Sequence, residues 1–312
     1  MKRSSPAVVV LQEVTIRYGT VTAVSSVSLS VSAGEVVALI GPDGAGKTSL
    51  LRATAGLQPV SAGKVEVFGL EAWKHRRELH HQLGYLPQHF ALYDDLSIAE
   101  NLAFIGHLMG LQHWQERRSL LLQRLGLANF QNRRAQALSG GMKRKLALAA
   151  SLMHDPRLLI LDEPTTGVDP ISRREFWRLL GEFVAEGLTL MVATPYLDEA
   201  QRASRVVLFH RGEVLAQGSP RELTQALKGR LLAVEGEPRA ELAAVLAALP
   251  GVAGVQPFGL GFHVTLAENA PPPDPQVFQN RGIRLHRFEA IPPTLEDVFL
   301  FELSRAAGEP KP

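Results

Sequence analysis

The chain has no cysteine, little net charge and no long hydrophobic run. The absence of cysteine excludes disulfides and thiol catalysis, and it leaves the redox compartment undetermined. No apolar run approaches the roughly 20 residues that a membrane helix needs, and the apolar stretch at residues 7–11 is too short for a signal peptide. If the protein acts at a membrane, we therefore expect another chain to span it.

The overall composition is that of a globular protein. The formal net charge is only +2, which gives no reason to expect a nucleic-acid partner. Hydrophobic residues make up 46% of the chain and charged residues 21%, so disorder is not expected. The 312 residues are enough for a full hydrophobic core and predict two domains.

Residues 41–48, Gly-Pro-Asp-Gly-Ala-Gly-Lys-Thr, fit the pattern of a phosphate-binding loop. An apolar run at 36–40 indicates a buried strand before it, and residues 48–55 indicate a helix after it. Small residues allow the backbone N–H groups and the helix N-terminus to surround an anion. Lys47 would reach the β- and γ-phosphates and Thr48 would hold Mg²⁺, unless the stretch is only a glycine-rich turn with a chance lysine.

Two adjacent carboxylates, Asp162 and Glu163, follow the apolar strand predicted at residues 158–161. Hydrolysis of a phosphoanhydride needs a metal ion and an oriented water molecule. Asp162 is suited to bind Mg²⁺, directly or through water, and Glu163 to polarise the attacking water. The alternative is a strand that simply ends in two solvated acids.

A second candidate for anion binding is Ser139-Gly140-Gly141, at the start of the helix predicted over residues 139–153. Bare backbone N–H groups at a helix N-terminus favour an anion, as they do in the phosphate loop. One chain rarely needs two such sites for one phosphate. We therefore expect this segment to face the nucleotide of another subunit.

The pattern of apolar residues predicts an α/β core followed by a smaller unit. Two antiparallel strands come first, a mainly helical stretch occupies residues 73–133, and strands and helices then alternate from 158, which implies a parallel sheet. After residue 229 the predicted order is β-α-β-β-α-β, then a final helix, which suggests a ferredoxin-like unit. The strands expected there are 231–234, 252–256, 261–266 and 283–288, and the helices are 239–249, 276–280 and 294–303.

Taken together, these motifs resemble the ATPase subunit of ATP-binding-cassette (ABC) transporters, over residues 8–227. The resemblance adds an aromatic residue at Tyr18, a Q-loop glutamine at Gln88 and a D-loop around Asp169. The fold it implies is a P-loop NTPase core with a parallel sheet, an antiparallel β subdomain and a helical subdomain at about 90–150. The domains are then 1–228 and 229–312, the second resembling the tail of ABC-2 type exporter ATPases.

The resemblance also implies ATP and Mg²⁺ as ligands. Tyr18 would stack on adenine, Gln88 would sense the metal and the water, and Ser139 and Gly141 would cap a partner's γ-phosphate. The implied catalytic residues are Lys47, Gln88 and Glu163, and the metal-binding residues are Thr48, Gln88 and Asp162. The implied nucleotide-binding residues are Tyr18, Gly41, Gly44, Ala45, Gly46, Lys47, Thr48, Ser49, Ser139, Gly140, Gly141 and Asp169.

The partners implied are an ABC-2 type transmembrane permease and a second nucleotide-binding domain, identical or different, at the cytoplasmic face of the cell membrane. Four apolar side chains in the helical segment 90–111 could fill a groove that holds a short helix of the permease. Alternatively, they only pack the helical subdomain. These side chains are Phe90, Leu92, Tyr93 and Leu96.

Three residues depart from the family pattern: Asp43 replaces asparagine, Met142 replaces glutamine, and Pro195 replaces the switch histidine. Proline has neither a side-chain donor nor a backbone N–H, so it cannot bind the γ-phosphate as histidine does. Asp43 and Pro195 together resemble the first cassette of tandem-cassette exporter ATPases. We expect either an export motor or a slowly hydrolysing subunit that supports a partner ATPase. A non-transport ATPase acting on DNA or the ribosome is disfavoured by the near-neutral charge.

Overall fold

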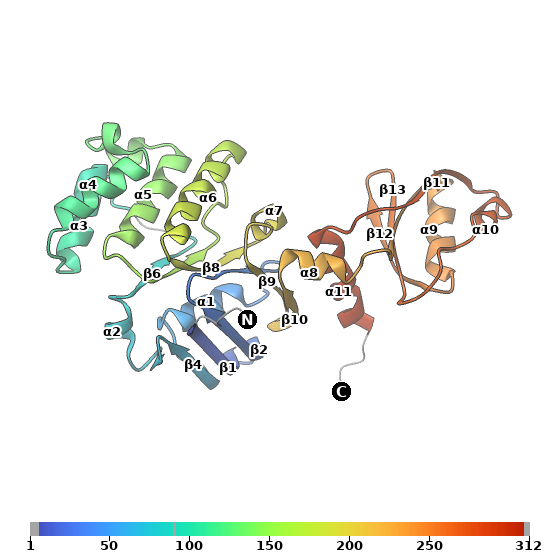
Figure 1. The fold of residues 1–312 in the computed structure, drawn as a ribbon, viewed down its shortest axis with the longest axis horizontal. Helices are drawn as coiled ribbons and strands as arrows, with labels where there is room; N and C mark the ends of the chain where they lie inside the picture. The colour runs from blue at the N-terminus through green and yellow to red at the C-terminus, as the bar shows by residue number, and fades with distance from the viewer. Residues whose placement is uncertain (1–5, 90–91, 309–312) are drawn as a thin grey trace. The chain divides into compact units, whose positions relative to one another are not determined.

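The chain divides into two compact units, Met1–Val214 and Leu215–Pro312. The structure is a computed structural model that describes residues 6–89 and 92–308 (Figure 1). The division precedes helix α8 (Pro220–Gln225), which packs against the last helix, α11 (Leu295–Gly308). It falls within strand β10 (Glu213–Gly218), ahead of the domain boundary predicted at 228 and 229, which stays a prediction. No helix in the described ranges is long and apolar enough to cross a membrane.

Two β-sheets frame the first unit, which includes only the first two residues of the edge strand β10. One has the strand order β10-β9-β3-β8-β7-β6, with parallel pairing from β9 to β6, and the other is antiparallel with the order β2-β1-β4-β5. The strands are β1 (Ala7–Tyr18), β2 (Val21–Ser32), β3 (Val36–Ile40), β4 (Ala62–Val67), β5 (Leu70–Glu71), β6 (Leu83–Leu86), β7 (Leu158–Asp162), β8 (Thr189–Thr194), β9 (Arg205–His210) and β10 (Glu213–Gly218). This arrangement confirms the predicted parallel core and antiparallel subdomain.

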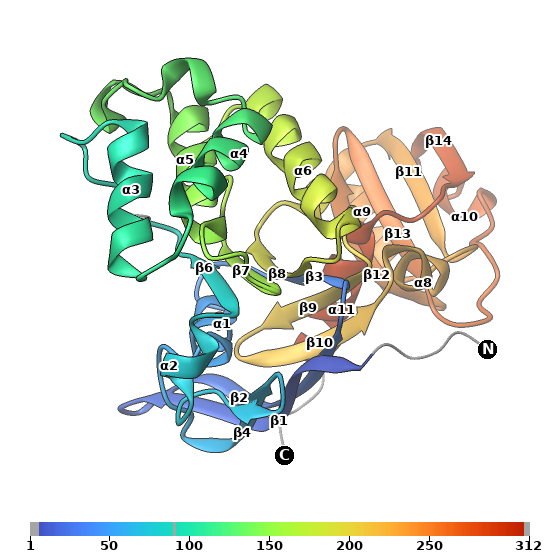
Figure 2. The ribbon, with the colours of Figure 1, turned by 60° about the vertical axis from the view of Figure 1, so that its left-hand side comes forward.

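Helices occupy both sides of the parallel sheet. Helix α1 lies on the side of the antiparallel sheet, and α3 to α6 lie on the other side (Figure 2). The helices of this unit are α1 (Lys47–Thr54), α2 (Arg76–Leu79), α3 (Ile98–Leu108), α4 (Trp114–Arg124), α5 (Gly140–Leu152), α6 (Pro170–Ala185) and α7 (Leu197–Ala200), with short 3-10 turns at Ala128–Phe130 and Ala135–Ala137.

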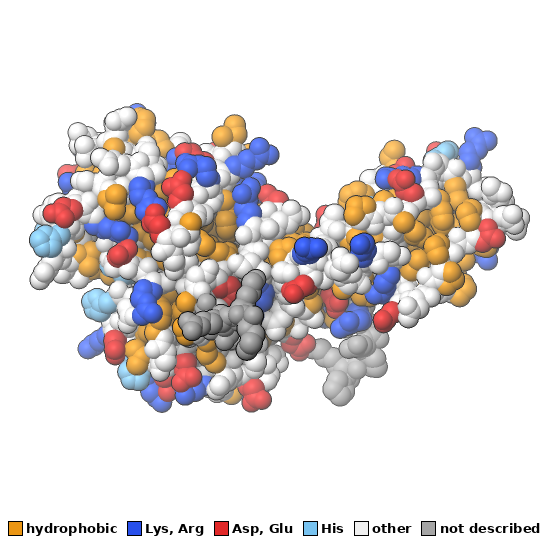
Figure 3. All heavy atoms as spheres, in the orientation of Figure 1, with side chains coloured by type: hydrophobic (Ala, Val, Ile, Leu, Met, Phe, Trp, Pro, Cys, Tyr) orange, Lys and Arg blue, Asp and Glu red, His pale blue; other side chains and the backbone are white. Residues whose placement is uncertain are grey.

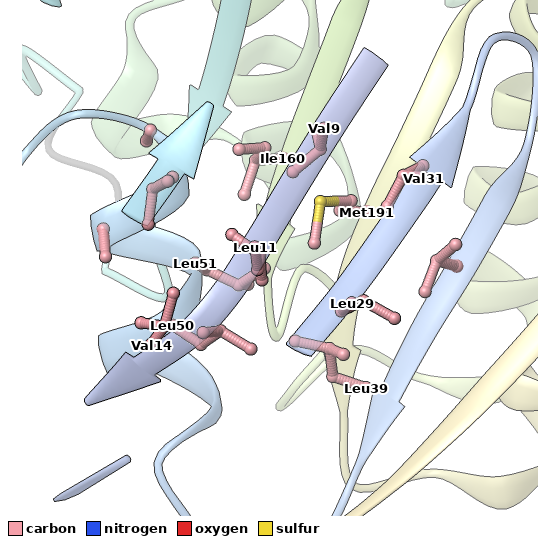
Figure 4. Close-up of a cluster of buried hydrophobic side chains, with 14 of the residues drawn as sticks. Val9, Leu11, Val14, Leu29, Val31, Leu39, Leu50, Leu51, Ile160 and Met191 are labelled. Atoms are coloured by element: carbon pink, nitrogen blue, oxygen red, sulfur yellow. The ribbon is translucent and has the colours of Figure 1, made fainter. Parts of the chain in front are cut away.

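Helix α1 is the element that both sheets share. It contacts β1, β2 and β4 of the antiparallel sheet and β7 and β8 of the parallel sheet. Leu50 and Leu51 are fully buried in the apolar cluster that also contains Leu11, Ile160 and Met191 (Figure 4). Burying a side chain of this size contributes about 1.5–3 kcal/mol. The loop before α1 is therefore attached to a helix that the core holds on two sides.

The helical spacing predicted over residues 73–133 is wrong at residues 83–86, which form strand β6. Four residues are too few for a period to show in the sequence. The strand forms because it pairs in parallel with β7, from Leu83 opposite Leu158 to Leu86 opposite Leu161. This pairing brings the segment that contains Gln88 to the end of β7, where the two carboxylates lie.

Elsewhere in this stretch, side-chain caps explain where the predicted helices begin. Ser97 and Glu100 form a reciprocal capping box at the start of α3, and the Ser139 side chain accepts a hydrogen bond from Met142 N at the start of α5. Both helices therefore start one residue after a capping serine, and for α5 this serine is Ser139, where the sequence predicts the helix to begin.

The second unit contains an antiparallel sheet with the strand order β12-β13-β11-β14. Its elements are β11 (Leu231–Glu237), α9 (Arg239–Ala248), β12 (Val252–Phe258), β13 (Gly261–Leu266), α10 (Gln276–Gln279) and β14 (Arg284–Ala290), followed by α11. This order confirms the predicted β-α-β-β-α-β unit, although α10 is only one turn long. Its core includes Leu242, Leu246, Val264 and Phe278.

Candidate nucleotide site

The phosphate loop joins the end of β3 to the start of α1. Lys47 Nζ donates hydrogen bonds to the carbonyl oxygens of Gly41 at 2.8 Å and Pro42 at 3.0 Å. Gly46 has a φ of 104°, and an added Cβ would lie 2.1 Å from Ala23 O, so only glycine fits. The loop thus wraps around the lysine, as a cradle for phosphate requires.

Lys47 is held among acids. Its side chain is 4% exposed, and Nζ lies 4.0 Å from Glu163 Oε1. Burial lowers the pKa of Lys47, and the charges of Glu163, Asp43 and Asp162 act in the opposite direction.

Asp162, at the end of β7, accepts hydrogen bonds from two elements. Thr48 Oγ1 donates to Oδ1 at 2.9 Å, and Tyr85 Oη donates to Oδ2 at 3.4 Å. Burial raises the pKa of Asp162, and burial together with the Asp162 charge raises the pKa of Tyr85 to about 12, so Tyr85 stays protonated.

These oxygens fit a magnesium ion. Mg²⁺ is usually held by one or two protein oxygens, with phosphate and water supplying the remaining ligands. Thr48 and Asp162 offer such oxygens side by side, and no group of three or more His, Asp or Glu side chains suited to a metal ion occurs in the described ranges. The residues present therefore fit a metal ion that arrives with a phosphate ligand.

Glu163 has an unusual backbone. Its φ is 48°, in the left-handed region that few non-glycine residues adopt, and its N–H donates to Ala193 O at 2.9 Å. Its side chain accepts hydrogen bonds at Oε2 from Gln88 Nε2 at 2.9 Å and from Thr166 Oγ1 at 3.2 Å. Backbone strain of this kind costs about 1–3 kcal/mol and is concentrated at functional sites.

Residues of the phosphate loop, together with Gln88 and Glu163, line one cavity of about 440 Å³. Its walls are Ala23, Asp43, Gly44, Ala45, Gly46, Lys47, Thr48, Ser49, Gln88 and Glu163. The structure therefore brings Gln88 and Glu163 to the phosphate loop. Tyr18 is not part of these walls: its ring is 51% exposed, and its hydroxyl lies 2.8 Å from Gln58 Oε1 and 3.3 Å from Ser49 Oγ.

Among the described residues, the cavity walls do not include four other predicted site residues, namely Ser139, Gly140, Gly141 and Asp169. Asp169 caps α6 and accepts hydrogen bonds from two backbone N–H groups, and its bond with the Ser172 N–H lowers its pKa. A side chain at Gly141 would meet Ser172 Oγ at 2.7 Å. Their predicted role at another protomer's nucleotide stays a prediction.

Arg144 is a site residue that the sequence analysis missed. It donates hydrogen bonds to Gln88 O at 3.0 Å and to Thr166 O at 3.3 Å, and burial lowers its pKa. Helix α5 is thereby joined to both segments whose side chains contact Glu163. Its only signal in the sequence is an arginine one turn after the Ser-Gly-Gly motif. Tyr85 and Thr166 were missed as well, since neither belongs to a phosphate-binding pattern.

The end of β8 shows what replaces the switch histidine. Pro195 is exposed directly after Thr194, two residues beyond the carbonyl of Ala193 that accepts from Glu163 N. His210 ends β9 and is partly buried, and burial lowers its pKa.

We expect Asp162→Asn to raise the melting temperature of the metal-free protein by a few degrees at pH 8. The raised pKa of Asp162 means that its contribution to stability is present at low pH and is lost as the pH rises through its folded pKa. The gain should therefore shrink toward pH 4. Calorimetry at several pH values measures it, with Asp198→Asn, an exposed acid, as the control. A gain that does not change with pH would contradict this account.

Comparison with known proteins begins with two family models. Residues 24–166 match the model described as "ABC transporter", and residues 218–301 match "ATP-binding protein DrrA1-3-like, C-terminal domain". The daunorubicin resistance ATP-binding protein DrrA3 of Streptomyces coeruleorubidus is 36% identical over 91% of this chain and 92% of its own length. The chain belongs to the ABC transporter ATP-binding proteins. The predicted family and fold class are thereby confirmed.

Two other relatives bear on the organisation of this ABC protein. The Nod factor export ATP-binding protein I of Rhizobium sp. (strain N33) is 34% identical over 91% of this chain and 92% of its own length. The probable multidrug ABC transporter ATP-binding protein YbhF of Escherichia coli (strain K12) is 38% identical over 93% of this chain. The chain spans only 50% of YbhF, and the match lies in the first half of that tandem-cassette protein.

Solved structures agree with this assignment. CbiO1 from Clostridium perfringens, part of an ABC transporter complex, has a TM-score of 0.65 and 28% identity, over 70% of this chain and 91% of its own. The dimeric bacterial ABC transporter cassette MJ0796 has a TM-score of 0.61 and 26% identity, over 68% of this chain and 98% of its own.

Proposed function

We propose that this chain binds Mg-ATP and hydrolyses it to power export through a separate ABC-2 type permease. The observation that carries the proposal is that Lys47, Thr48, Gln88 and Glu163 line one cavity, with Asp162 bonded to Thr48. Lys47 and the loop N–H groups would bind the phosphates. Bound Mg²⁺ would neutralise phosphate charge, while Glu163, oriented by Gln88, would position the attacking water.

The site needs a second cassette in this proposal. Gly140 is exposed at the N-terminus of α5 and does not line the chain's own cavity, so it is available to a nucleotide held by another protomer. ATP would then close a pair of cassettes, and hydrolysis would reopen it, biasing the permease each time. The second cassette is a copy of this chain or a different ATPase.

We place the permease contact on the helical side of the first unit. An apolar cavity of about 270 Å³ lies there, and Leu57, Tyr85, Ile105 and Leu108 are among its walls. Tyr93 is 52% exposed and packs edge-on against Phe104 with ring centroids 4.8 Å apart, and Leu92 and Leu96 are partly buried. Phe90 lies outside the described residues.

The test is to reconstitute the purified chain with a candidate permease in vesicles and to measure ATP hydrolysis and transport together. Permease-stimulated, Mg²⁺-dependent hydrolysis is the expected result, and a folded chain that fails to retain Mg-ATP would refute the proposal. The relatives are named for a drug and for a Nod factor, so we propose that the permease selects the cargo.

A slow site that supports a partner ATPase is the second candidate, and Pro195 favours it. The chain carries no histidine side chain where the family has its γ-phosphate donor, while Lys47, Thr48, Asp162 and Glu163 are all in place. Losing one transition-state donor typically slows a reaction by on the order of 100- to 1000-fold. The match between this chain and the first half of the tandem-cassette protein YbhF also supports a slow site that acts with a partner ATPase.

We expect Pro195→His to raise the turnover of the purified chain by roughly 10-fold or more, because it restores a donor at the exposed end of β8. Steady-state phosphate release measures the gain. Pro195→Ala, which restores only a backbone N–H, is the control and should stay at the natural rate. Rapid turnover by the natural chain alone would show that the proline does not limit the site.

A role on DNA or the ribosome is less well supported. Lys and Arg side chains are interspersed with Asp and Glu on the face drawn in Figure 3, and they do not gather in one stripe. Nucleic-acid-binding proteins usually present a concentrated basic surface. Co-purification with a protein of several membrane spans would separate the transport reading from this one.

A further inference from the structure

A buried carboxylate outside the nucleotide cavity joins two segments next to Glu163. Glu199, on α7, is 1% exposed. Thr165 Oγ1 donates a hydrogen bond to its Oε1, and Thr194 Oγ1 donates to its Oε2 at 2.6 Å. A buried charge needs such donors, because leaving it unpaired is costly. The two oxygens of Glu199 therefore form a bridge between the turn after β7 and the end of β8.

Both segments that the bridge joins contact Glu163, one at its side chain and the other at its backbone N–H. Thr165 is two residues beyond Glu163, in the turn whose next residue, Thr166, donates to Glu163 Oε2 at 3.2 Å. Thr194 directly follows Ala193, whose carbonyl accepts from Glu163 N at 2.9 Å. The left-handed φ of 48° at Glu163 must be held by its surroundings, since the isolated residue would leave it.

A positively charged side chain, Arg173, lies near the Glu199 carboxylate. Arg173 Nε, on α6, lies 3.9 Å from Glu199 Oε1, and its guanidinium lies over the Tyr196 ring, 4.3 Å from the centroid. Asp198, the neighbouring acid on α7, is exposed and lies 3.7 Å from Arg173 Nη1. Arg173 thus gives the buried carboxylate a positive neighbour from a third element.

We propose that Glu199 is a positioning residue that holds Glu163 in its strained conformation by joining Thr165 to Thr194. The inference rests on the proposed function for its kinetic part only. In the part of the chain that the structure describes, the side-chain contacts of Glu199 go to Thr165, Thr194 and Arg173, none of which lines the cavity. Its loss should therefore affect the chemical step and spare ATP binding. Misplacing a catalytic group by about 1 Å can lower the rate by about 100-fold.

The decisive variant is Thr165→Val, which removes one arm of the bridge while keeping the shape of the side chain. We expect hydrogen exchange of the amides at residues 163–168 to become at least roughly 10-fold faster in the nucleotide-free protein. We expect kcat to fall about 10-fold and the affinity for ATP to change less than about 2-fold. Thr224→Val, which removes a half-buried hydroxyl that donates to Pro220 O on α8, is the matched control and should change none of these.

A graded series tests the carboxylate itself. Glu199→Gln keeps one acceptor oxygen and can donate from its amide to the second hydroxyl, so it should retain more activity than Glu199→Ala at equal ATP affinity. A merely structural role would instead lower the melting temperature and leave the kcat of the remaining folded protein unchanged.

The two ideas can fail separately. Unchanged exchange at residues 163–168 in Thr165→Val would overturn the positioning role, whatever the ATPase shows. Absence of hydrolysis by the natural chain with any partner would overturn the proposed function, and the exchange measurement would still decide the role of Glu199.

Discussion

Glu163→Gln is expected to lower ATP turnover by roughly 1000-fold and to leave ATP binding intact. The amide keeps the size of the side chain and can still contact Gln88 and Thr166, so the cavity keeps its walls. It lacks the negative charge that orients and polarises water. Phosphate release measures the rate, and a fluorescent ATP analogue measures the affinity.

The size of this effect depends on how fast the natural site is. If Pro195 already limits hydrolysis, the fall in the natural chain will be smaller than in a Pro195→His background. Measuring Glu163→Gln in both backgrounds therefore distinguishes slow hydrolysis caused by a weakly acting Glu163 from slow hydrolysis caused by the missing histidine at position 195. Glu182→Gln, on the exposed face of α6, serves as the control. Equal turnover with and without Glu163 in both backgrounds would rule out a catalytic role for this residue.

Lys47→Ala is expected to weaken ATP binding by about 100-fold or more. Each hydrogen bond to a charged group contributes about 1.5–3 kcal/mol, and 1.4 kcal/mol is a factor of ten in affinity. Lys47 also donates to the carbonyls of Gly41 and Pro42, so the variant loses these two hydrogen bonds as well as the charge. Titration with the ATP analogue at fixed Mg²⁺ measures the loss.

Stability provides the internal check for this variant. Burial lowers the pKa of Lys47, so its charge is not favoured by the folded apo protein, and removing it should change the melting temperature little. Lys74→Ala, which alters an exposed pair with Glu71, is the control and should bind ATP normally. Unchanged affinity in folded Lys47→Ala would refute the assignment of the loop.

Features that depend on neighbouring residues could be predicted from the sequence. The phosphate loop is a run of small residues between an apolar strand and a helix, and the helix caps at Ser97 and Ser139 depend on backbone groups within one turn. The same holds for the β-α-β-β-α-β order of the second unit, because each element was visible in its own apolar pattern.

Other features were decided only when distant segments met. Strand β6 is too short to show a period, and its pairing with β7 made it a strand and brought Gln88 to Glu163, 75 residues away in the chain. Arg144 reaches Gln88 from 56 residues away, and Glu199 joins its two threonines only because β7 and β8 are parallel neighbours.

The sequence by itself thus determined that this ABC protein carries a phosphate loop and paired carboxylates, since these are local patterns of residue type. Tertiary structure alone decided which side chains surround Glu163. The physical reason is that a backbone strained at Glu163 needs support from several elements at once, and the register of parallel strands, which no local pattern encodes, provides it.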